Sequence, residues 1–422
     1  MVFSYSRATI VALVLLALEA FPVARSTPWL VTDGLAASLP GRARAKAGLH
    51  TPEKALLTQI RFLSSKSYTR VMLNLTRKTA YEAHRLGGNS SKGLPPRIYI
   101  DLRNAGLALR SKNPIDVHDG LLRQVRVGQF RENVVRVVLD LNSPGEPKVF
   151  MLPDPYRLVI DVPGQNGAGP LALTTKDKRL SPVSGGHEPP PARVGIRKIV
   201  LDPGHGGKDP GAIGIDGLAE KDIVLKVAKK LAAKIRKEMG IKVVLTRTDD
   251  RYVALEDRTA MANAEDADLF ISLHMNASRN REARGLETYY LDSTNDEAAI
   301  RLAERENGTS RNNVSDLQFI LSDMTQNMKL EDSITLAHHV QDSLVGLMSG
   351  KTHGVRDLGV KKALFYVLVG ARMPSVLVEM FFITNKTEGR EMAQSRYQDA
   401  VVDALYEGVK EYNQSMLAMK TL

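Results

Sequence analysis

The feature that most constrains the fold is a regular alternation of strand-like runs and helical segments that begins at residue 196. The helical run 220–240 repeats its apolar residues at the α-helical period, with Ile223, Val227, Leu231 and Ile235 on one face. Further helices are predicted at 254–266 and 395–413, and strands at 197–202, 242–247, 268–274, 285–291, 364–369 and 374–380. This alternation predicts an α/β domain with a mostly parallel sheet flanked by helices.

A second, smaller domain is indicated by residues 58–163, where the pattern has the period of strands. Four runs at 70–75, 97–102, 134–141 and 156–162 alternate apolar and polar residues. The run 70–75 is similar to 136–141, and 97–102 is similar to 157–162. We therefore predict a small pseudo-symmetric all-β domain at 58–163. Residues 164–194 lack periodicity and include three prolines at 189–191, which predicts a linker.

The N-terminus has the layout of a secretory signal peptide. Arg7 precedes the apolar run 8–18, which is too short to span a bilayer comfortably, and the small residues Ala20 and Ala24 follow it. We expect residues 1–26 to be removed on export, 27–57 to form an N-terminal extension, and the mature protein to have no transmembrane span. An uncleaved N-terminal anchor is the alternative.

The composition limits the chemistry available to the chain. It contains no cysteine, so disulfides and thiolate metal sites are excluded, and any metal must bind histidine and carboxylate ligands. The formal net charge is +11, and the basic excess lies in the N-terminal half, whereas 196–422 is nearly balanced. Such an excess suits an acidic polymer, an anionic surface or a nucleic acid.

A glycine-rich loop at 201–212, with the sequence LDPGHGGKDPGA, follows the first predicted strand of the α/β domain. Such a loop could cradle a phosphate with its backbone amides, or its central His205 could bind a metal. The phosphate interpretation is disfavoured, because the loop lacks the Lys-Ser/Thr ending of a P-loop and the G-x-G-x-x-G pattern before a helix.

Three polar residues stand where predicted strands end: His205, His274 and Glu379. Ligands gather at this edge of open α/β sheets, and the glycine-rich loop could bring Glu220, at the start of the first helix, toward His205. Alone, Glu220 could be a partner for the helix dipole and His274 a hydrogen-bonded core residue. Together, two histidines and one carboxylate leave an open position for water on a tetrahedral zinc ion, and Glu379 is free to accept a proton. The pattern indicates metal-assisted hydrolysis.

Six segments of the C-terminal half resemble the zinc-dependent N-acetylmuramoyl-L-alanine amidases of the amidase_3 type, which cut peptidoglycan. They read IVLDPGHGGKDPGAIG, EKDIVLKVAKKL, KVVLTRTDDRYVALEDRTAMAN, ADLFISLHMNAS, GLETYYL and PSVLVEMFFITN. The resemblance covers nearly all of the catalytic domain predicted at 195–422. The β domain is similar to the AMIN domain that precedes such amidases in the AmiC-like cell-separation enzymes of Gram-negative bacteria.

The resemblance implies a role for each site residue. His205, Glu220 and His274 match the zinc ligands of the family, and Glu379 matches its catalytic glutamate. The implied substrate is the amide bond between N-acetylmuramic acid and L-alanine of the stem peptide, and the implied setting is septal wall splitting in the periplasm, with no nucleic-acid partner. The chain departs from the family after Glu379: Phe381 and Phe382 stand where glycine and phenylalanine are frequent, and TNK replaces SNP.

The connection at about 292–350 is too long for a simple link between strands. It contains helix-like runs at 296–310 and 330–348. In the cell-separation subgroup this region resembles an inhibitory helix that covers the zinc until a LytM-domain activator displaces it. Glu306 and Glu304 are the candidate zinc-blocking carboxylates, although both could be solvated helix residues. His338 and His339 are expected to serve helix packing and the surface.

Two other functions are compatible with parts of this pattern. One is a catalytically silent peptidoglycan-binding protein that keeps the α/β fold as a scaffold, which the presence of all four site residues disfavours. The other is a zinc peptidase that cuts within the stem peptide, which shares the metal chemistry and differs in the bond cleaved.

Overall fold

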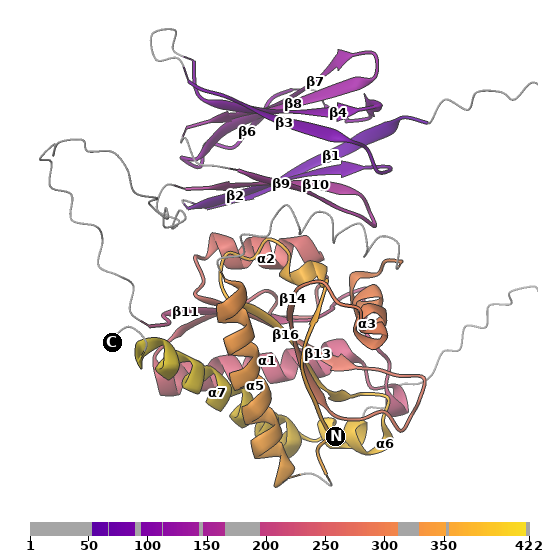
Figure 1. Cartoon of the computed structure of the whole chain (residues 1–422), viewed down its shortest axis with the longest axis vertical. Coiled ribbons are helices and arrows are strands. Elements are labelled where there is room, and N and C mark those ends of the chain that lie inside the picture. Colours follow the sequence, from indigo (N-terminus) through magenta and orange to yellow (C-terminus); the bar gives the residue numbers. More distant parts are fainter. Residues whose placement is uncertain are drawn as a thin grey trace, which may run out of the picture. The chain divides into compact units, whose positions relative to one another are not determined.

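A computed structural model describes residues 53–65, 67–88, 94–111, 113–142, 147–164, 195–310, 329–351 and 354–418 (Figure 1). Residues 52–422 form one compact unit. The predicted signal peptide, the extension up to residue 52 and the linker from residue 165 lie outside the described residues. Among the described helices, none combines the length and the apolar character needed to cross a membrane.

The N-terminal part is a pair of stacked sheets (Figure 1). The first has the strand order β5-β1-β2-β10-β9, comprising Ala105–Leu107, Ala55–Ser64, Tyr68–Leu75, Arg157–Pro163 and Lys148–Leu152. The second has the order β3-β4-β8-β7-β6, comprising Tyr81–Leu86, Arg97–Arg103, Val134–Leu141, Leu122–Arg131 and Ile115–Asp116. The four predicted strands correspond to β2, β4, β8 and β10, and β1 begins three residues before the predicted border at 58.

The predicted internal repeat is visible in the strand pairing. Strand β2 pairs antiparallel with β10, which places Arg70 opposite Asp161, and β4 pairs antiparallel with β8, which places Asp101 opposite Arg136. The apolar residues between these positions point inward and form one core between the two sheets. The central pair of each sheet therefore combines one strand from each copy of the repeat.

The C-terminal part is an α/β domain with a six-stranded sheet in the order β12-β11-β13-β16-β14-β15. These strands are Lys242–Leu245, Lys198–Pro203, Leu269–Asn276, Ser375–Phe382, Leu286–Leu291 and Asp357–Ala363. Neighbouring strands are parallel except β14 and β16, which are antiparallel. The mostly parallel sheet is as predicted, and β11, β13 and β16 end at the same edge.

Helices cover both faces of this sheet. Helices α1 (Glu220–Met239), α5 (Leu330–Ser349) and α7 (Ser395–Ala418) share one apolar cluster with the sheet. Helices α2 (Leu255–Ala264) and α3 (Glu297–Asn307) contribute to a second cluster. The short η2 (Ile215–Gly217) and α6 (Lys386–Met392) lie in the connections.

One predicted strand is wrong. Residues 364–369 contain a 3₁₀ turn, η3 (Tyr366–Leu368), and the strand in this region is β15, at 357–363. The run is fully buried in the second cluster, and periodicity cannot separate a buried strand from another buried segment. Strand β15 is only half-buried and lacks strong apolar alternation, so its sequence carries a weak strand signal.

Candidate metal centre

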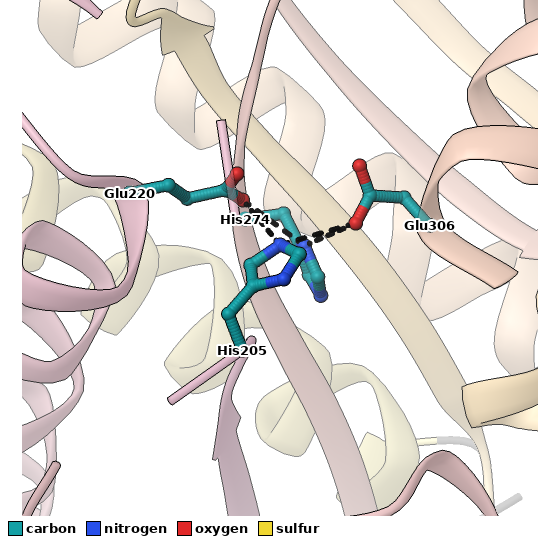
Figure 2. A group of neighbouring side chains, drawn as sticks. All are labelled: His205, Glu220, His274 and Glu306. Atoms are coloured by element: carbon teal, nitrogen blue, oxygen red, sulfur yellow. Dashed lines mark hydrogen bonds and ion pairs between the residues drawn. The ribbon is translucent and has the colours of Figure 1, made fainter. Parts of the chain in front are cut away.

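The edge where β11, β13 and β16 end gathers the predicted site residues. His205 follows β11 in a left-handed backbone conformation, with φ of 59°. His274 lies near the end of β13, and Glu220 is the first residue of α1. Glu306, near the end of α3, joins them, and one ligand atom from each of the four lies within 4.8 Å of the others. Figure 2 shows the two carboxylates reaching the imidazoles from opposite sides.

The distances show a closed group of four ligand atoms. His205 Nε2 lies 3.2 Å from Glu220 Oε1 and 3.2 Å from Glu306 Oε2. His274 Nδ1 lies 3.1 Å from each of the same two oxygens. The two nitrogens and two oxygens therefore surround one common point.

The group has the features expected of a metal site. His205 Nε2 and Glu306 Oε2 are buried and make no hydrogen bond among the described residues, although buried polar atoms are nearly always bonded. A cation between the four atoms would satisfy both. Two imidazoles and two carboxylates are the donor set that suits zinc in the absence of cysteine. The residues present therefore fit this metal.

Neighbouring groups orient the ligands. Asp209 Oδ2 lies 2.9 Å from His205 Nδ1, the ring nitrogen that points away from the group. Glu220 accepts backbone N–H bonds at both oxygens, at 2.9 Å from Met275 and 2.8 Å from Ala212. Such second partners fix the tautomer of a ligating histidine and the orientation of a ligating carboxylate.

The charges in the group are strongly coupled. Burial alone would lower the pKa of His274, but the Glu306 and Glu220 carboxylates raise it to about 9. Burial opposes the charged form of Glu220, and His205 nevertheless lowers the pKa of this carboxyl to about 2. The two carboxylates are thus held ionised and favour a positive charge between the histidines.

Two glycines of the loop are needed for close approach. A Cβ on Gly204 would collide with the His274 ring. Gly211 has φ of 68°, and a Cβ there would lie 2.6 Å from His205 Cδ2 and 2.7 Å from Glu220 Oε2. The glycine pattern of the loop is therefore explained by packing around the ligands.

Two buried arginines hold the loop and were missed from the sequence. Arg258, on α2, forms an ion pair with Asp202 at 2.8 Å and donates to the His205 carbonyl at 3.0 Å. Arg247 donates to the Gly204 carbonyl at 2.8 Å. In the sequence both look like solvated charges, because only the fold shows that their carbonyl partners are buried. Their only sequence signal is a position within segments that resemble the family.

Glu379, the last of the predicted site residues, lies within β16, three residues before the strand ends at Phe382, and is fully buried. Neither of its carboxylate oxygens has a hydrogen bond among the described residues, and the nearest cation is Arg305, whose Nη2 lies 3.9 Å from Oε1. Burial and the neighbouring Glu306 carboxylate raise the pKa of Glu379 well above its usual value. A carboxyl with a raised pKa beside a metal site has the properties of a general base.

The structure distinguishes the two candidate blocking carboxylates. Glu306 belongs to the metal-binding group, whereas Glu304 is half-buried and lies outside it. His338 is exposed and His339 packs against Tyr412 on α7, as expected for residues that serve packing and the surface.

The departure from the family pattern after Glu379 has a structural consequence. Phe381 has φ of 72°, a conformation that favours glycine, and it occupies the position where the family often has glycine. A non-glycine residue in this region costs about 1 to 3 kcal/mol. The side chain is almost fully buried in the cluster of α1, α5 and α7, so its packing offsets part of this cost.

The fold and the site define an α/β domain with a buried His/Glu group at the sheet edge that could hold a metal ion. The chain matches the N-acetylmuramoyl-L-alanine amidase family over residues 199–411 and the AMIN domain over 59–148. The chain therefore belongs to the N-acetylmuramoyl-L-alanine amidase family and is a peptidoglycan hydrolase of this activity.

Two curated relatives, which are similar over most of this chain, agree with this assignment. The amidase AmiC of Escherichia coli is 31% identical over 381 residues, covering 84% of this chain and 88% of the relative. AmiC of Neisseria meningitidis is 31% identical, covering 88% and 94% of the two chains. A solved N-acetylmuramoyl-L-alanine amidase from Clostridium difficile 630 is 32% identical with a TM-score of 0.41, covering 52% of this chain and 98% of that structure.

Proposed function

We propose that this chain is a periplasmic zinc amidase of septal wall splitting that rests in an inhibited state. His205, Glu220 and His274 hold the zinc, Glu306 takes the fourth position, and Glu379 is the base. The observation that carries the proposal is the convergence of four ligand atoms within 4.8 Å, two of which are buried without a hydrogen bond.

The chain's own residues divide the work of hydrolysis. When bound, zinc supplies a Lewis acid that polarises the scissile carbonyl and makes water more acidic. Glu379 accepts the proton of the attacking water and returns it to the departing amide nitrogen of L-alanine. Arg258 and Arg247 keep the His205 loop in place through its carbonyls, and the buried position of Glu379 suits its raised pKa.

Activation requires that Glu306 leave the site. Because its carboxylate completes the group of four ligands, no position is left for water while α3 stays in place. A LytM-domain activator that displaces α3 would open this position. The AMIN domain would direct the enzyme within the envelope, and the signal peptide proposed at 1–26 would deliver it to the periplasm.

The experiment is digestion of purified sacculi with zinc analysis of the same preparation. We expect bound zinc in a one-to-one ratio, activity abolished by a chelator and restored by zinc, and glycan products with free lactyl ends. Glycans that still carry L-alanine would favour a peptidase within the stem peptide. Protein with zinc and without hydrolysis, even after removal of the 292–333 segment, would favour a silent binding protein.

A further inference from the structure

The two outer faces of the AMIN domain are built from the two copies of its repeat. We define the docked face as the outer side of β1, β2, β9 and β10, and the open face as the outer side of β3, β4, β7 and β8. Arg70 on the docked face holds Asp161 by two hydrogen bonds of 2.7 Å. Arg136 on the open face holds Asp101 in the same way, at 2.6 and 2.7 Å. The two faces therefore repeat the same construction.

The docked face has an occupant, which is the start of helix α2. Arg70 uses its remaining nitrogen, Nη1, to donate to the Glu256 carbonyl at 2.8 Å and to the Thr259 hydroxyl at 3.0 Å. Arg157 and Arg61 form ion pairs with the Glu256 carboxylate, at 2.5 and 2.8 Å. This face therefore recognises a helix start through a main-chain carbonyl and an acidic side chain.

Burial shows that this contact is extensive. Arg70 is fully buried, and four apolar residues of the docked face share a cluster with residues of the catalytic domain: Met72, Phe150, Leu152 and Val159. Their partners include Phe365 and Leu368, next to η3 or within it. The docked face thus combines the Arg70–Asp161 ion pair with apolar residues packed around it.

The open face carries the same elements without an occupant among the described residues. Arg136 Nη1, the counterpart of the Arg70 nitrogen that binds α2, donates no hydrogen bond among them. The Arg136 side chain is 27% exposed, and Phe130 beside it is 47% exposed. The Nη1 donor that Arg70 uses to bind α2 on the docked face is therefore available in Arg136 on the open face.

The charge of the open face selects an acidic partner. Arg97 is the counterpart of Arg157, and both Arg97 and Arg126 pair with the single carboxylate of Asp140, at 3.6 and 2.8 Å. With the Arg136–Asp101 pair and the Arg103–Glu82 pair on the same face, four arginines stand with three carboxylates. The surplus of positive charge complements a carboxylate, as the docked face complements Glu256.

The aromatic residues of the open face favour a protein segment over a sugar. The Arg136 guanidinium lies 4.2 Å from the Tyr99 ring centre and 3.6 Å from that of Phe130, and His84 stacks on Tyr99 at 4.8 Å. These rings already carry cationic or stacked partners, so less of their surface is available to stack on a sugar. The start of a helix needs no free ring surface. Its carbonyl would accept a hydrogen bond from Arg136, and its carboxylate would be attracted by the surplus positive charge.

We propose that the open face is a second docking surface, which binds the acidic first turn of a helix in a partner protein as the docked face binds α2. The partner presents a first-turn main-chain carbonyl, which can accept a second hydrogen bond from Arg136, and one or two carboxylates to the arginines around it. A second copy of this chain would not offer α2 itself, because its own docked face covers that helix start.

The probe is a labelled, helix-stabilised peptide that copies residues 252–266, titrated with the full chain by fluorescence anisotropy. We expect saturable binding that weakens roughly tenfold or more in Arg136→Gln, because a charge-assisted hydrogen bond is lost. A peptide with Glu256→Lys and Asp257→Lys should not bind. Arg123→Gln, an exposed arginine on β7 with no side-chain contact to the open face, is the control and should bind as the parent does.

Second measurements separate the alternatives. Phe130→Ser, which removes an exposed ring and leaves the Arg136–Asp101 pair intact, should also weaken binding, while zinc-dependent amidase activity stays unchanged. Failure of the peptide to bind, or binding to Arg136→Gln and to Phe130→Ser as tight as to the parent chain, overturns the proposal. So does Arg136-dependent binding of soluble muropeptides in place of the peptide, or Arg136-dependent dimerisation, since each assigns the face to a different occupant.

Discussion

The Arg305 guanidinium lies between the carboxylates of Glu306 and Glu379, with Nε 2.8 Å from Glu306 Oε1 and Nη2 3.9 Å from Glu379 Oε1. Arg305 also donates to the Ala277 carbonyl at 2.8 Å. Helix α3 is thus tied both to the proposed zinc site and to the proposed base. Its displacement would free the metal position and remove the cation nearest to Glu379 in one movement.

Replacing Glu306 should activate the enzyme. Glu306→Ala removes the fourth ligand and opens a position for water, so basal hydrolysis of sacculi should rise several-fold without an activator, with zinc retained by the other three ligands. Glu304→Ala is the matched control, because Glu304 lies on the same helix outside the group. Equal basal rates in the two variants would contradict the inhibitory role.

Replacing Arg305 should activate the enzyme to a smaller extent. Arg305→Met removes the ties to Ala277 and Glu379 and leaves Glu306 able to bind zinc, so α3 should loosen without leaving. Faster amide hydrogen exchange in 297–307 and a modest rise in basal rate are expected. Arg301→Met is the control, since this residue is exposed and its one ion pair among the described residues is with Glu297 on the same helix, at 3.7 Å. No difference between the two arginine variants would show that α3 is held by other contacts.

Replacing Glu379 should abolish hydrolysis and leave the metal in place. Glu379→Gln keeps the shape of the side chain and removes the proton acceptor, which typically costs about 10²- to 10⁴-fold in rate. Zinc content should be unchanged, because Glu379 is not one of the four ligands. The comparison is best made in the Glu306→Ala background, where basal activity is expected to be high. Full activity in Glu379→Gln would assign the base to another residue.

Glu388 should make stability depend on pH. Burial raises the pKa of this carboxyl to about 7, despite its hydrogen bonds from the Phe382 and Gly285 backbone. The folded protein therefore binds one more proton than the unfolded chain between the ordinary carboxyl pKa and pH 7. The contribution of Glu388 to the free energy of unfolding is therefore present at low pH. It is lost as pH rises through this window, and the loss amounts to up to about 3 kcal/mol.

Chemical denaturation at pH 5 and pH 8 measures this effect. In Glu388→Gln the difference in unfolding free energy between the two pH values should be smaller than in the parent. The amide also weakens one of the two hydrogen bonds from the backbone, but it does so equally at both pH values. An unchanged difference would mean that another group carries the pH dependence.

Much of the site could be predicted from the sequence because its residues stand at the ends of strands. The carboxyl ends of parallel strands share one edge, so His205, His274 and Glu379 were placed together before the fold was known. The loop glycines also predicted a tight turn that exposes His205, and the structure adds that two of them lie against the site side chains. In the N-terminal domain, the alternation of apolar and polar residues predicted four strands and the repeat predicted a pseudo-symmetric all-β domain, whereas the pairing of these strands was decided by the fold.

The choice between Glu304 and Glu306 was made only by the tertiary structure, because residues two positions apart differ by about 200° around the helix axis and the sequence does not state which side faces the sheet. The role of Arg258 was also decided only by the tertiary structure, because its buried carbonyl partners come from a distant segment. The conformation of residues 364–369 was decided there too, because a fully buried run has no periodicity that separates a strand from a turn. Local patterns determined the elements and the ligand types. Long-range packing decided which carboxylate joins the two histidines and Glu220, and which face of the AMIN domain is covered.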